Sequence, residues 1–490
     1  FLLRNQQLLY PILTTRSQKD EGVAMLRDRY SFDGSFLALI KGLDVEMEPE
    51  LAQIDRILDD QELYQLIKAD FSRRFPQTLE TGRDSTPVEV LLRMLTVKRL
   101  YGFNYRETEW HTRDSLVLRQ FCRVYFNQVP DHTTLNRWAQ LIEPETLHAF
   151  NRRIDELAKA AKVTRARKVR TDGTVVETNI AHPSDSKLLA DGVRVISRTI
   201  KRAKGVMSDA VQKATRIFRD RTRSARNQAR RISDCARRSG EAAKAELKEA
   251  YDSLIETAKA STRQAEAVLE MLEDEKSQVA DRLRETLQTF VSRVKQVIDQ
   301  TIRRVFQDET VPAQEKIVSL FEPHTDIIQR GKVGKPTEFG HKVWLSEVDG
   351  GIVTEWEVLK GNPPDSDQWK PAIDHHIALF GKPPDLASGD RGVYSPDNEE
   401  YATKKGVRRV ILPQPGRKTE ARKQYERQRW FRRGRRFHAG IEGRISVLKR
   451  GHGLDRCLDH GKAGFERWVG WGVISGNLAV MGRALAAKAS

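Results

Sequence analysis

The feature that most constrains this chain is a proline-free stretch from residue 186 to residue 306. Apolar residues recur along it at spacings of three and four, with charged residues between them, a pattern typical of helices that pack along a narrow apolar stripe. The pattern predicts a coiled coil of two antiparallel helices that separate at Gly240, since glycine suits the position after a helix C-terminus. One long kinked helix is the alternative. The first half of the stripe contains Val193, Ile196, Ile200, Ala203, Met207, Ala210, Ala214 and Ile217.

Charge divides this stretch into two halves. Residues 201–238 hold thirteen Lys or Arg against three Asp, whereas residues 241–285 hold twelve acidic residues against seven basic ones. The basic half could bind DNA, and the apolar stripe could mediate dimerisation. The acidic half is a competing partner for the basic half, and a spacer with solvated charges is the plainer interpretation.

The whole chain is basic, with 490 residues and a formal net charge of +17. A second basic cluster, residues 417–436, holds ten Lys or Arg against two Glu. Clusters this dense favour a polyanionic partner, most simply nucleic acid. The most apolar segment, near the C-terminus, contains Asn477 and Arg483, so it predicts an amphipathic helix and no membrane span.

Two further observations concern the cell compartment and the chain start. Three widely separated cysteines without a CxxC pair argue against a disulfide framework or a zinc ribbon, and they fit a reducing cytoplasm. No signal peptide is visible. Because the first residue is Phe1, we expect the native start to lie upstream.

Residues 1–160 predict a helical N-terminal domain. A helix is expected from Thr86, with a capping Ser/Thr and Pro87 at its start. The later segment "VPDHTTLNRWAQLI" predicts a turn, a cap at Asp131 or Thr133, and a helix that carries Arg137. Two helices joined by a short loop could form a helix-turn-helix that reads DNA, although many small helical domains share this pattern.

Strand patterns flank the long helical stretch. The segment "RKVRTDGTVVETNI" predicts two short strands around Asp172 and Gly173. Beyond residue 331 the chain predicts a β-hairpin that turns at Asp349-Gly350, followed by helix, strand, helix and strand. We therefore expect a mixed α/β core in two pieces, residues 161–185 and 331–490, separated by a helical insertion over residues 186–330.

Three acidic residues lie where this core would hold them rigidly. Asp172 lies in the first strand, Asp390 ends another, and Glu442 lies in a predicted helix. Taken singly, an acid at a strand end is usually a cap or turn residue, and a helical Glu is usually solvated. Together, two Asp from neighbouring strands and one helical Glu can hold two Mg²⁺ ions through hard oxygen ligands. Such a pair of ions promotes cleavage and transfer of phosphodiesters.

Five motifs in order carry a resemblance to a known family: "TDGTVVETNIAHPSDSKLL", "GKPTEFGHKVWL", "GNPPDSD", "ASGDRGVYSPDN" and "HAGIEGRISVLKRGHGLDRC". The chain resembles the DDE transposases of bacterial insertion sequences, of the ISNCY or a neighbouring group. The resemblance implies a ribonuclease-H-like core whose acids are Asp172, Asp390 and Glu442. It implies Mg²⁺ as cofactor, with Mn²⁺ as a substitute, and a reaction that cleaves element ends and joins 3′-hydroxyls to target DNA.

The resemblance also implies residues that contact DNA. Relatives often carry a Tyr and an Arg before the Glu and a Lys after it. Lys449 lies seven residues after Glu442 on the same helix face, but Arg435 and His438 stand where the Tyr and the Arg are common. Trp430 could stack on an unpaired base. The expected DNA contacts are Arg137, Arg391, Trp430, Arg435, Arg436, His438, Arg444 and Lys449.

The implied partners are double-stranded DNA, as inverted repeats and as target, and further copies of the chain in a homodimer or higher oligomer. The implied location is the bacterial cytoplasm, at the nucleoid. The insertion is unusual, because relatives often carry theirs after the second Asp. Two other functions stay open: a non-catalytic DNA-binding protein derived from a transposase, and a structural coiled-coil protein.

Overall fold

The computed structural model describes residues 27–73, 85–205, 218–273, 275–332 and 335–489. The chain divides into two compact units. Unit 1 comprises the residues up to Met47, together with 58–98 and 103–142, and unit 2 comprises 48–57, 99–102 and 143–490. The sequence boundary at residue 160 falls later than this division, because the helix that ends there packs within unit 2.

Unit 1 is helical, as the sequence predicts. The long helix expected from Thr86 is divided into three, since Asn104 and Ser115 cap new helices with their side chains. Asp131 caps a further helix by accepting from the backbone N–H groups of Thr133 and Thr134, which confirms one of the two expected caps. The helices are α1 (Gly34–Gly42), α3 (Gln61–Arg73), α4 (Val88–Leu100), α5 (Tyr105–Asp114), α6 (Leu116–Phe121) and α7 (His132–Ala139).

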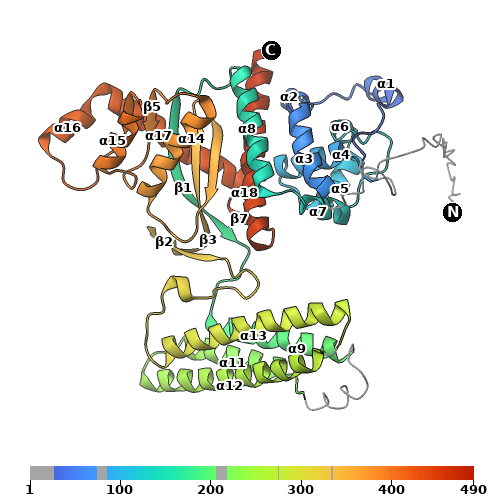
Figure 1. The fold of residues 1–490 in the computed structure, drawn as a ribbon, viewed down its shortest axis with the longest axis vertical. Coiled ribbons are helices and arrows are strands. Elements are labelled where there is room, and N and C mark those ends of the chain that lie inside the picture. Colours follow the sequence, from blue (N-terminus) through green and yellow to red (C-terminus); the bar gives the residue numbers. More distant parts are fainter. Residues whose placement is uncertain (1–26, 74–84, 206–217, 274, 333–334, 490) are drawn as a thin grey trace, which may run out of the picture. The chain divides into compact units, whose positions relative to one another are not determined.

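A mixed β-sheet forms the centre of unit 2 (Figure 1). Its central strand β1 pairs antiparallel with β3 and parallel with β5 and β7. On the far side of β3 lie the antiparallel strands β2 and β4, and β6 runs parallel beside β5. The strands are β1 (Lys168–Thr178), β2 (Asp326–Lys332), β3 (Lys335–Val348), β4 (Ile352–Val358), β5 (Leu386–Ser388), β6 (Arg409–Ile411) and β7 (Arg456–Cys457).

Two strand predictions have different outcomes. The hairpin at Asp349-Gly350 is confirmed, with Gly350 and Gly351 at φ 95° and 83°, a region that favours glycine. The two short strands expected around Asp172 are instead one strand, β1. Gly173 does not interrupt it, because this glycine stays extended and pairs with Trp344 of β3.

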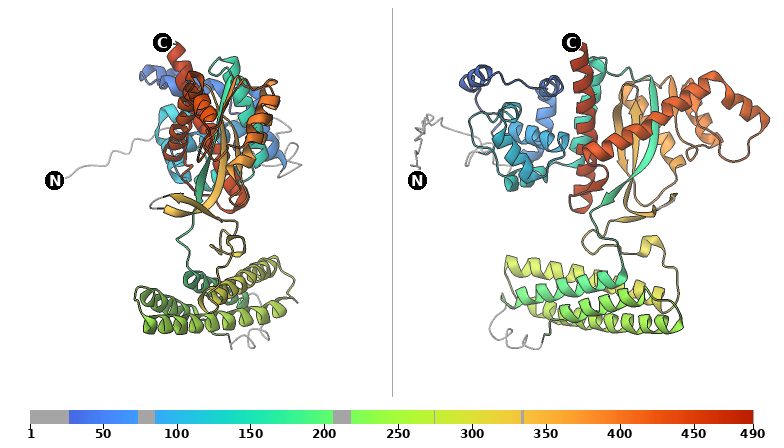
Figure 2. Two further views of the ribbon diagram at one scale, coloured as in Figure 1. Left: turned by 90° about the vertical axis from the view of Figure 1, so that its left-hand side faces the viewer. Right: turned by 180° about the vertical axis from the view of Figure 1, so that it is seen from behind.

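Helices cover both faces of the sheet, an arrangement that fits the α/β class. Figure 1 shows α14 before one face, and the reversed view in Figure 2 shows α17 and α18 before the other. The helices of unit 2 outside the insertion are α2 (Pro49–Ile57), α8 (Pro144–Ala160), α14 (Trp369–Phe380), α15 (Pro396–Lys404), α16 (Glu420–Arg427), α17 (Arg429–His452) and α18 (Gly461–Ala489). Single turns η2 (Ala313–Glu315) and η3 (Asp365–Gln368) precede β2 and α14. In the part of the chain that the structure describes, no helix is long and apolar enough to cross a membrane.

The insertion between β1 and β2 is a helical bundle. Its described helices are α9 (Asp185–Lys204), α11 (Thr222–Cys235), α12 (Glu241–Leu272) and α13 (Gln278–Val305). The break expected at Gly240 is confirmed, with φ 107° just before α12. The two-helix coiled coil is not confirmed, because α9, α11, α12 and α13 all contribute to one core. The expected stripe residues Met207, Ala210, Ala214 and Ile217 lie outside the described residues.

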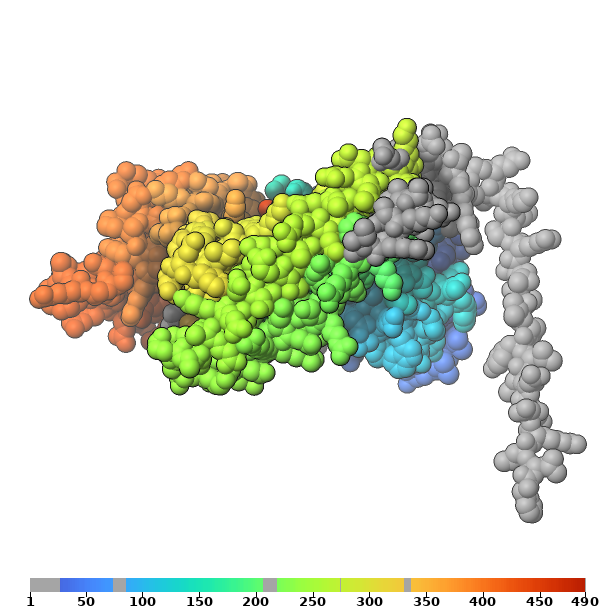
Figure 3. All heavy atoms as spheres, turned by 90° about the horizontal axis from the view of Figure 1, so that it is seen from below, coloured from blue at the N-terminus to red at the C-terminus, as the bar shows by residue number. Residues whose placement is uncertain are grey.

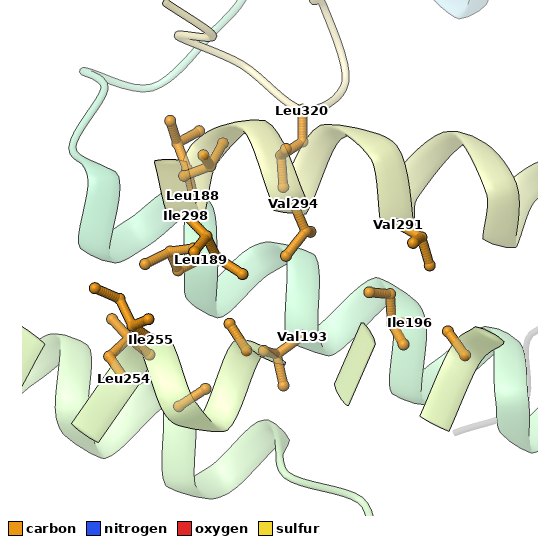
Figure 4. Packing of buried hydrophobic residues seen from close by; sticks show 14 of the residues in the cluster. Leu188, Leu189, Val193, Ile196, Leu254, Ile255, Val291, Val294, Ile298 and Leu320 are labelled. Atoms are coloured by element: carbon orange, nitrogen blue, oxygen red, sulfur yellow. The ribbon is translucent and has the colours of Figure 1, made fainter. Parts of the chain in front are cut away.

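One glycine sets how closely two helices of this bundle approach. A Cβ atom built on Gly192 of α9 would lie 2.3 Å from Cγ2 of Val294 on α13. Both residues are buried in the apolar core that Figure 4 shows between α9, α12 and α13. The position therefore requires a residue without a side chain.

Gly192→Ala is expected to destabilise the bundle by about 1–3 kcal/mol through overpacking. The usual effect of alanine inside a helix is the opposite, a stabilisation of about 1 kcal/mol. Gly451→Ala in α17 is the matched control, because a Cβ there meets nothing within 4 Å. Urea unfolding of the two variants measures the difference. Stabilisation by Gly192→Ala would contradict the close contact.

Candidate active site

The first two acids of the expected triad are brought together by two parallel strands. The register of β1 and β5 pairs Arg170 with Ser388, so two residues further along each chain lie Asp172 and Asp390. Neighbouring strands are about 4.8 Å apart. After β5 ends, the backbone N–H groups of Gly392 and Val393 donate to Asp390 Oδ1 at 2.9 and 3.1 Å, which fixes this side chain in a turn.

Glu442 enters from α17, which runs beside β1 in the same direction (Figure 2). In the first half of α17, the backbone carbonyl of Phe437 accepts a hydrogen bond from Arg170. Further along, Lys449 Nζ donates to the carbonyl of Val175 at 2.8 Å. Glu442 lies between these two contacts on the helix, as Asp172 lies between Arg170 and Val175 on the strand. The Glu442 side chain is exposed, so it is accessible to a substrate.

A mostly buried arginine, Arg170, holds α17 against the sheet. Arg170 donates to both carboxylate oxygens of Glu347 on β3, at 2.7 Å each, and its guanidinium lies 4.8 Å from the ring centre of Phe437. The helix can come this close because residue 440 is glycine. A Cβ on Gly440 would lie 2.2 Å from Arg170 Nη1. The close contact with Arg170 therefore explains why residue 440, the first glycine of "HAGIEG", has no side chain.

His438 lies one helical turn before Glu442 and is half-buried. Its Nδ1 atom is buried and has no hydrogen-bond partner within the described part of the chain. Burial lowers the pKa of His438, the nearby carboxylates of Asp390 and Glu442 oppose that shift, and Arg170 adds to it. A lowered pKa keeps the ring mostly neutral at pH 7, so His438 is a hydrogen-bonding group more than a cation.

A fourth carboxylate, absent from the sequence prediction, lies in the same place. A Cβ built on Gly392 would be 3.3 Å from an oxygen of Asp365 and 3.3 Å from an oxygen of Asp390. A Cβ on Gly173, next to Asp172, would be 3.2 Å from the other oxygen of Asp365. Asp365 is therefore close to both strands of the site. Its signal in the sequence was the motif "GNPPDSD", which resembles the family but does not by itself indicate a role.

Asp365 has a buried cationic partner. Lys342 of β3 is 4% exposed, and its Nζ lies 2.6 Å from Asp365 Oδ1. The same ammonium group donates to the carbonyl of Pro363. Removing such a charge from water is costly unless it is paired, so the ion pair fixes the loop before α14 against β3.

The residues expected to contact DNA lie in different environments. Arg391, Arg435 and Arg436 are exposed close to the acids in sequence, and Arg137 is exposed on α7 of unit 1. Trp430 is half-buried against Tyr425 and Phe431, so its ring already packs within the protein.

Arg444 does not have the surface position that a DNA contact requires. It is 7% exposed, it donates to Asn477 Oδ1 of α18 at 3.0 Å, and burial lowers its pKa to about 10. The sequence prediction placed it among the residues that contact DNA near Glu442. On an α-helix, two residues turn a side chain to a different face, and this one faces α18.

Carboxylate oxygens dominate the site, and they are the donors that Mg²⁺ and Mn²⁺ prefer. In the described part of the chain, no three His, Cys, Asp or Glu side chains are already grouped so that they could hold a metal ion. What the structure shows is that the elements carrying Asp172, Asp390 and Glu442 lie side by side, through the pairing of β1 with β5 and the contacts of α17 with β1. The chemistry of these three side chains fits a hard cation.

One comparison with known proteins gives a match. Residues 43–141 match the family model described as "Transposase domain (DUF772)". No curated protein and no solved structure matches the chain. The matched residues precede β1, so the match is independent of the acids described above. It supports a transposase, which is a DNA-processing enzyme.

Proposed function

We propose that this protein is a DDE transposase of the ISNCY or a neighbouring group, with a ribonuclease-H-like core. It cleaves DNA at the ends of an insertion sequence and joins the 3′-hydroxyl ends to target DNA. The observation that carries the proposal is the approach of three acid-bearing elements: β1 with Asp172, the end of β5 with Asp390, and α17 with Glu442. The strand order, with β1 between antiparallel β3 and parallel β5, supports the core.

In this proposal Asp172, Asp390 and Glu442 hold Mg²⁺, or Mn²⁺ in its place. A bound cation of this kind would polarise the phosphodiester and favour ionisation of the attacking water or hydroxyl. Arg170 keeps α17 at its distance from β1 and thereby keeps Glu442 beside Asp172. His438 offers a neutral hydrogen-bonding group to a phosphate near Asp390.

DNA contacts in this proposal come from the exposed basic residues. Arg391 follows Asp390 directly, and Arg435 and Arg436 lie on α17 before Glu442. Lys449 donates to the Val175 carbonyl, so its role includes orienting α17. Arg444 is not among the contacts, because it is buried.

The proposal is tested with the full chain and a labelled DNA fragment that carries the sequences flanking its coding region. Strand cleavage that needs Mg²⁺ or Mn²⁺, followed by transfer of the cut ends to a plasmid, is the expected result. Specific binding of the fragment with no cleavage under any divalent cation would instead identify a non-catalytic DNA-binding protein.

Asp365→Asn is expected to lower the cleavage rate at least tenfold while leaving DNA binding within about twofold. The amide removes a negative charge beside Asp390 and leaves the buried Lys342 cation without its carboxylate partner. The matched control is Asp367→Asn in the same turn, where the side chain is exposed. Cleavage rates are measured across a Mg²⁺ titration. Equal rates for both variants would remove Asp365 from the site.

A further inference from the structure

A basic groove lies on the inserted bundle, outside the candidate active site. Its first part, of about 350 Å³, lies between α9 and α11 and is lined by Lys187 and Arg194 of α9 and by Arg226 and Arg230 of α11, among others. A second part, of about 600 Å³, continues along α11 and adds Arg223. We call these two parts together the basic groove. Figure 3 shows the surface of the bundle in green.

Three of these arginines share one face of α11. Arg223, Arg226 and Arg230 are spaced by three and four residues, which places their side chains in a row. All three are exposed and line the groove. No ion pair holds them within the described part of the bundle.

Other arginines of the same segment are already neutralised. Arg231 lies 3.2 Å from Glu249 of α12, and Arg238 lies 2.8 Å from Glu246. Among the residues that the structure describes, the acidic half of the insertion therefore pairs with the basic half along the α11–α12 seam. The pairing leaves the row of Arg223, Arg226 and Arg230 as positive charge directed to solvent.

The acids near the groove do not cancel this charge. Asp191 is engaged by Arg194 on its own helix, at 3.0 Å. Asp220 accepts hydrogen bonds from Thr222, and these lower its pKa. The groove is thus lined by two carboxylates and five basic side chains: Lys187, Arg194 and the three arginines of the row. A net positive, open and elongated groove matches a continuous line of phosphates better than a single small anion.

The spacing of the row matches a nucleic-acid backbone. The helical rise places Arg230 about 10 Å beyond Arg223 along α11. Phosphates of one DNA strand recur about every 3.4 Å along the duplex axis, so the row spans roughly three of them. The arginine side chains are long enough to reach neighbouring phosphates from one helix face.

We propose that the basic groove binds the phosphate backbone of double-stranded DNA, without reading its sequence, and so gives the transposase a second DNA-binding surface. The inference rests on the proposed function only in taking DNA as the substrate. It assigns to the insertion a binding role that neither the acids of the core nor the match over residues 43–141 addresses.

The test measures the affinity of the full chain for duplex DNA across a salt series. The triple variant Arg223→Gln, Arg226→Gln, Arg230→Gln is expected to bind at least tenfold more weakly at 0.15 M salt. Its log–log salt dependence should be less steep by about 0.9 for each phosphate that the variant no longer neutralises, up to about 2.7. Preference between two duplex sequences should not change. Circular dichroism and thermal unfolding confirm that the bundle is intact.

The matched control removes three charges elsewhere on the bundle. Lys244, Lys248 and Lys259 of α12 each pair with an acid, and their triple Gln variant should keep the slope of the wild-type protein. An equal decrease in affinity in both variants would show a net-charge effect and overturn the groove. Unchanged affinity and slope in the arginine variant would overturn it too. So would a decrease seen with single-stranded RNA and not with duplex DNA.

Cleavage separates this inference from the proposed function. A wild-type protein that cuts DNA while the arginine variant keeps its salt slope leaves the function standing and removes the groove. If the wild-type protein never cuts DNA, but the arginine variant binds DNA more weakly than the wild-type protein, the groove stands and the proposed function is removed.

Discussion

Replacing Asp172, Asp390 or Glu442 by its amide is expected to reduce DNA cleavage by roughly a thousandfold or more, since residues that act as one catalytic unit each remove most of the activity when lost. The changes Asp172→Asn, Asp390→Asn and Glu442→Gln keep the size of each side chain and remove one carboxylate charge from the site. Cation affinity should fall with the charge. Cleavage of a labelled end fragment, followed over a range of Mg²⁺ concentrations, measures both effects.

The fold should survive these changes, because none of the three side chains is part of the apolar core. Unfolding free energies within about 1 kcal/mol of the wild-type value are expected, and end binding should persist. Glu420→Gln, an exposed acid at the start of α16, is the control and should cut normally. Full activity in any one amide variant would exclude that residue from the site.

The elements that carry this candidate site could be anticipated from the sequence, because their positions depend on short-range rules. An acid inside an alternating strand, as at Asp172, and an acid directly after a strand, as at Asp390, lie on elements whose direction the sequence indicates. Parallel pairing then aligns the two ends. To predict the position of Glu442, it was enough to predict a helix long enough to run beside β1.

Other features depend on contacts between distant segments, and the sequence could not show them. Asp365 reaches the site through a loop whose path is set by the buried Lys342 of another strand. Arg444 looks like a DNA contact in the sequence, but it is buried and donates a hydrogen bond to Asn477 of α18, which lies 33 residues further along the chain. The apolar spacing of residues 186–306 fits either a two-helix coiled coil or a bundle, because both present one apolar face per helix. The two folds differ in the number of helices into which the stretch is divided, and the apolar spacing does not show that number.

The second large effect concerns the anchor between α17 and the sheet. Glu347→Gln is expected to cost about 3–5 kcal/mol of unfolding free energy, because removing one partner leaves a buried charge unpaired. Glu347 is 1% exposed and Arg170 is mostly buried, so water cannot replace the missing carboxylate. The effect is larger than for a simple pair, since Glu347 is also the carboxylate that favours the charged form of buried Arg444. One substitution thus leaves Arg170 without its carboxylate partner and removes a negative charge whose field favours the charged form of Arg444.

The same substitution should affect cleavage beyond its effect on stability. Arg170 fixes the backbone of Phe437, one turn and a little before Glu442, so a displaced Arg170 frees the helix that carries the third acid. Cleavage measured well below the unfolding temperature should therefore fall even where circular dichroism shows folded protein. Glu177→Gln is the control on the neighbouring strand β1. Its partner Arg456 is about half exposed, so the decrease in stability should stay below about 1 kcal/mol, with cleavage retained. If Glu347→Gln lost stability but cut at the wild-type rate while folded, α17 would hold Glu442 in place without this ion pair, and the register of the helix against β1 would have to rest on Lys449 and the packing of α18.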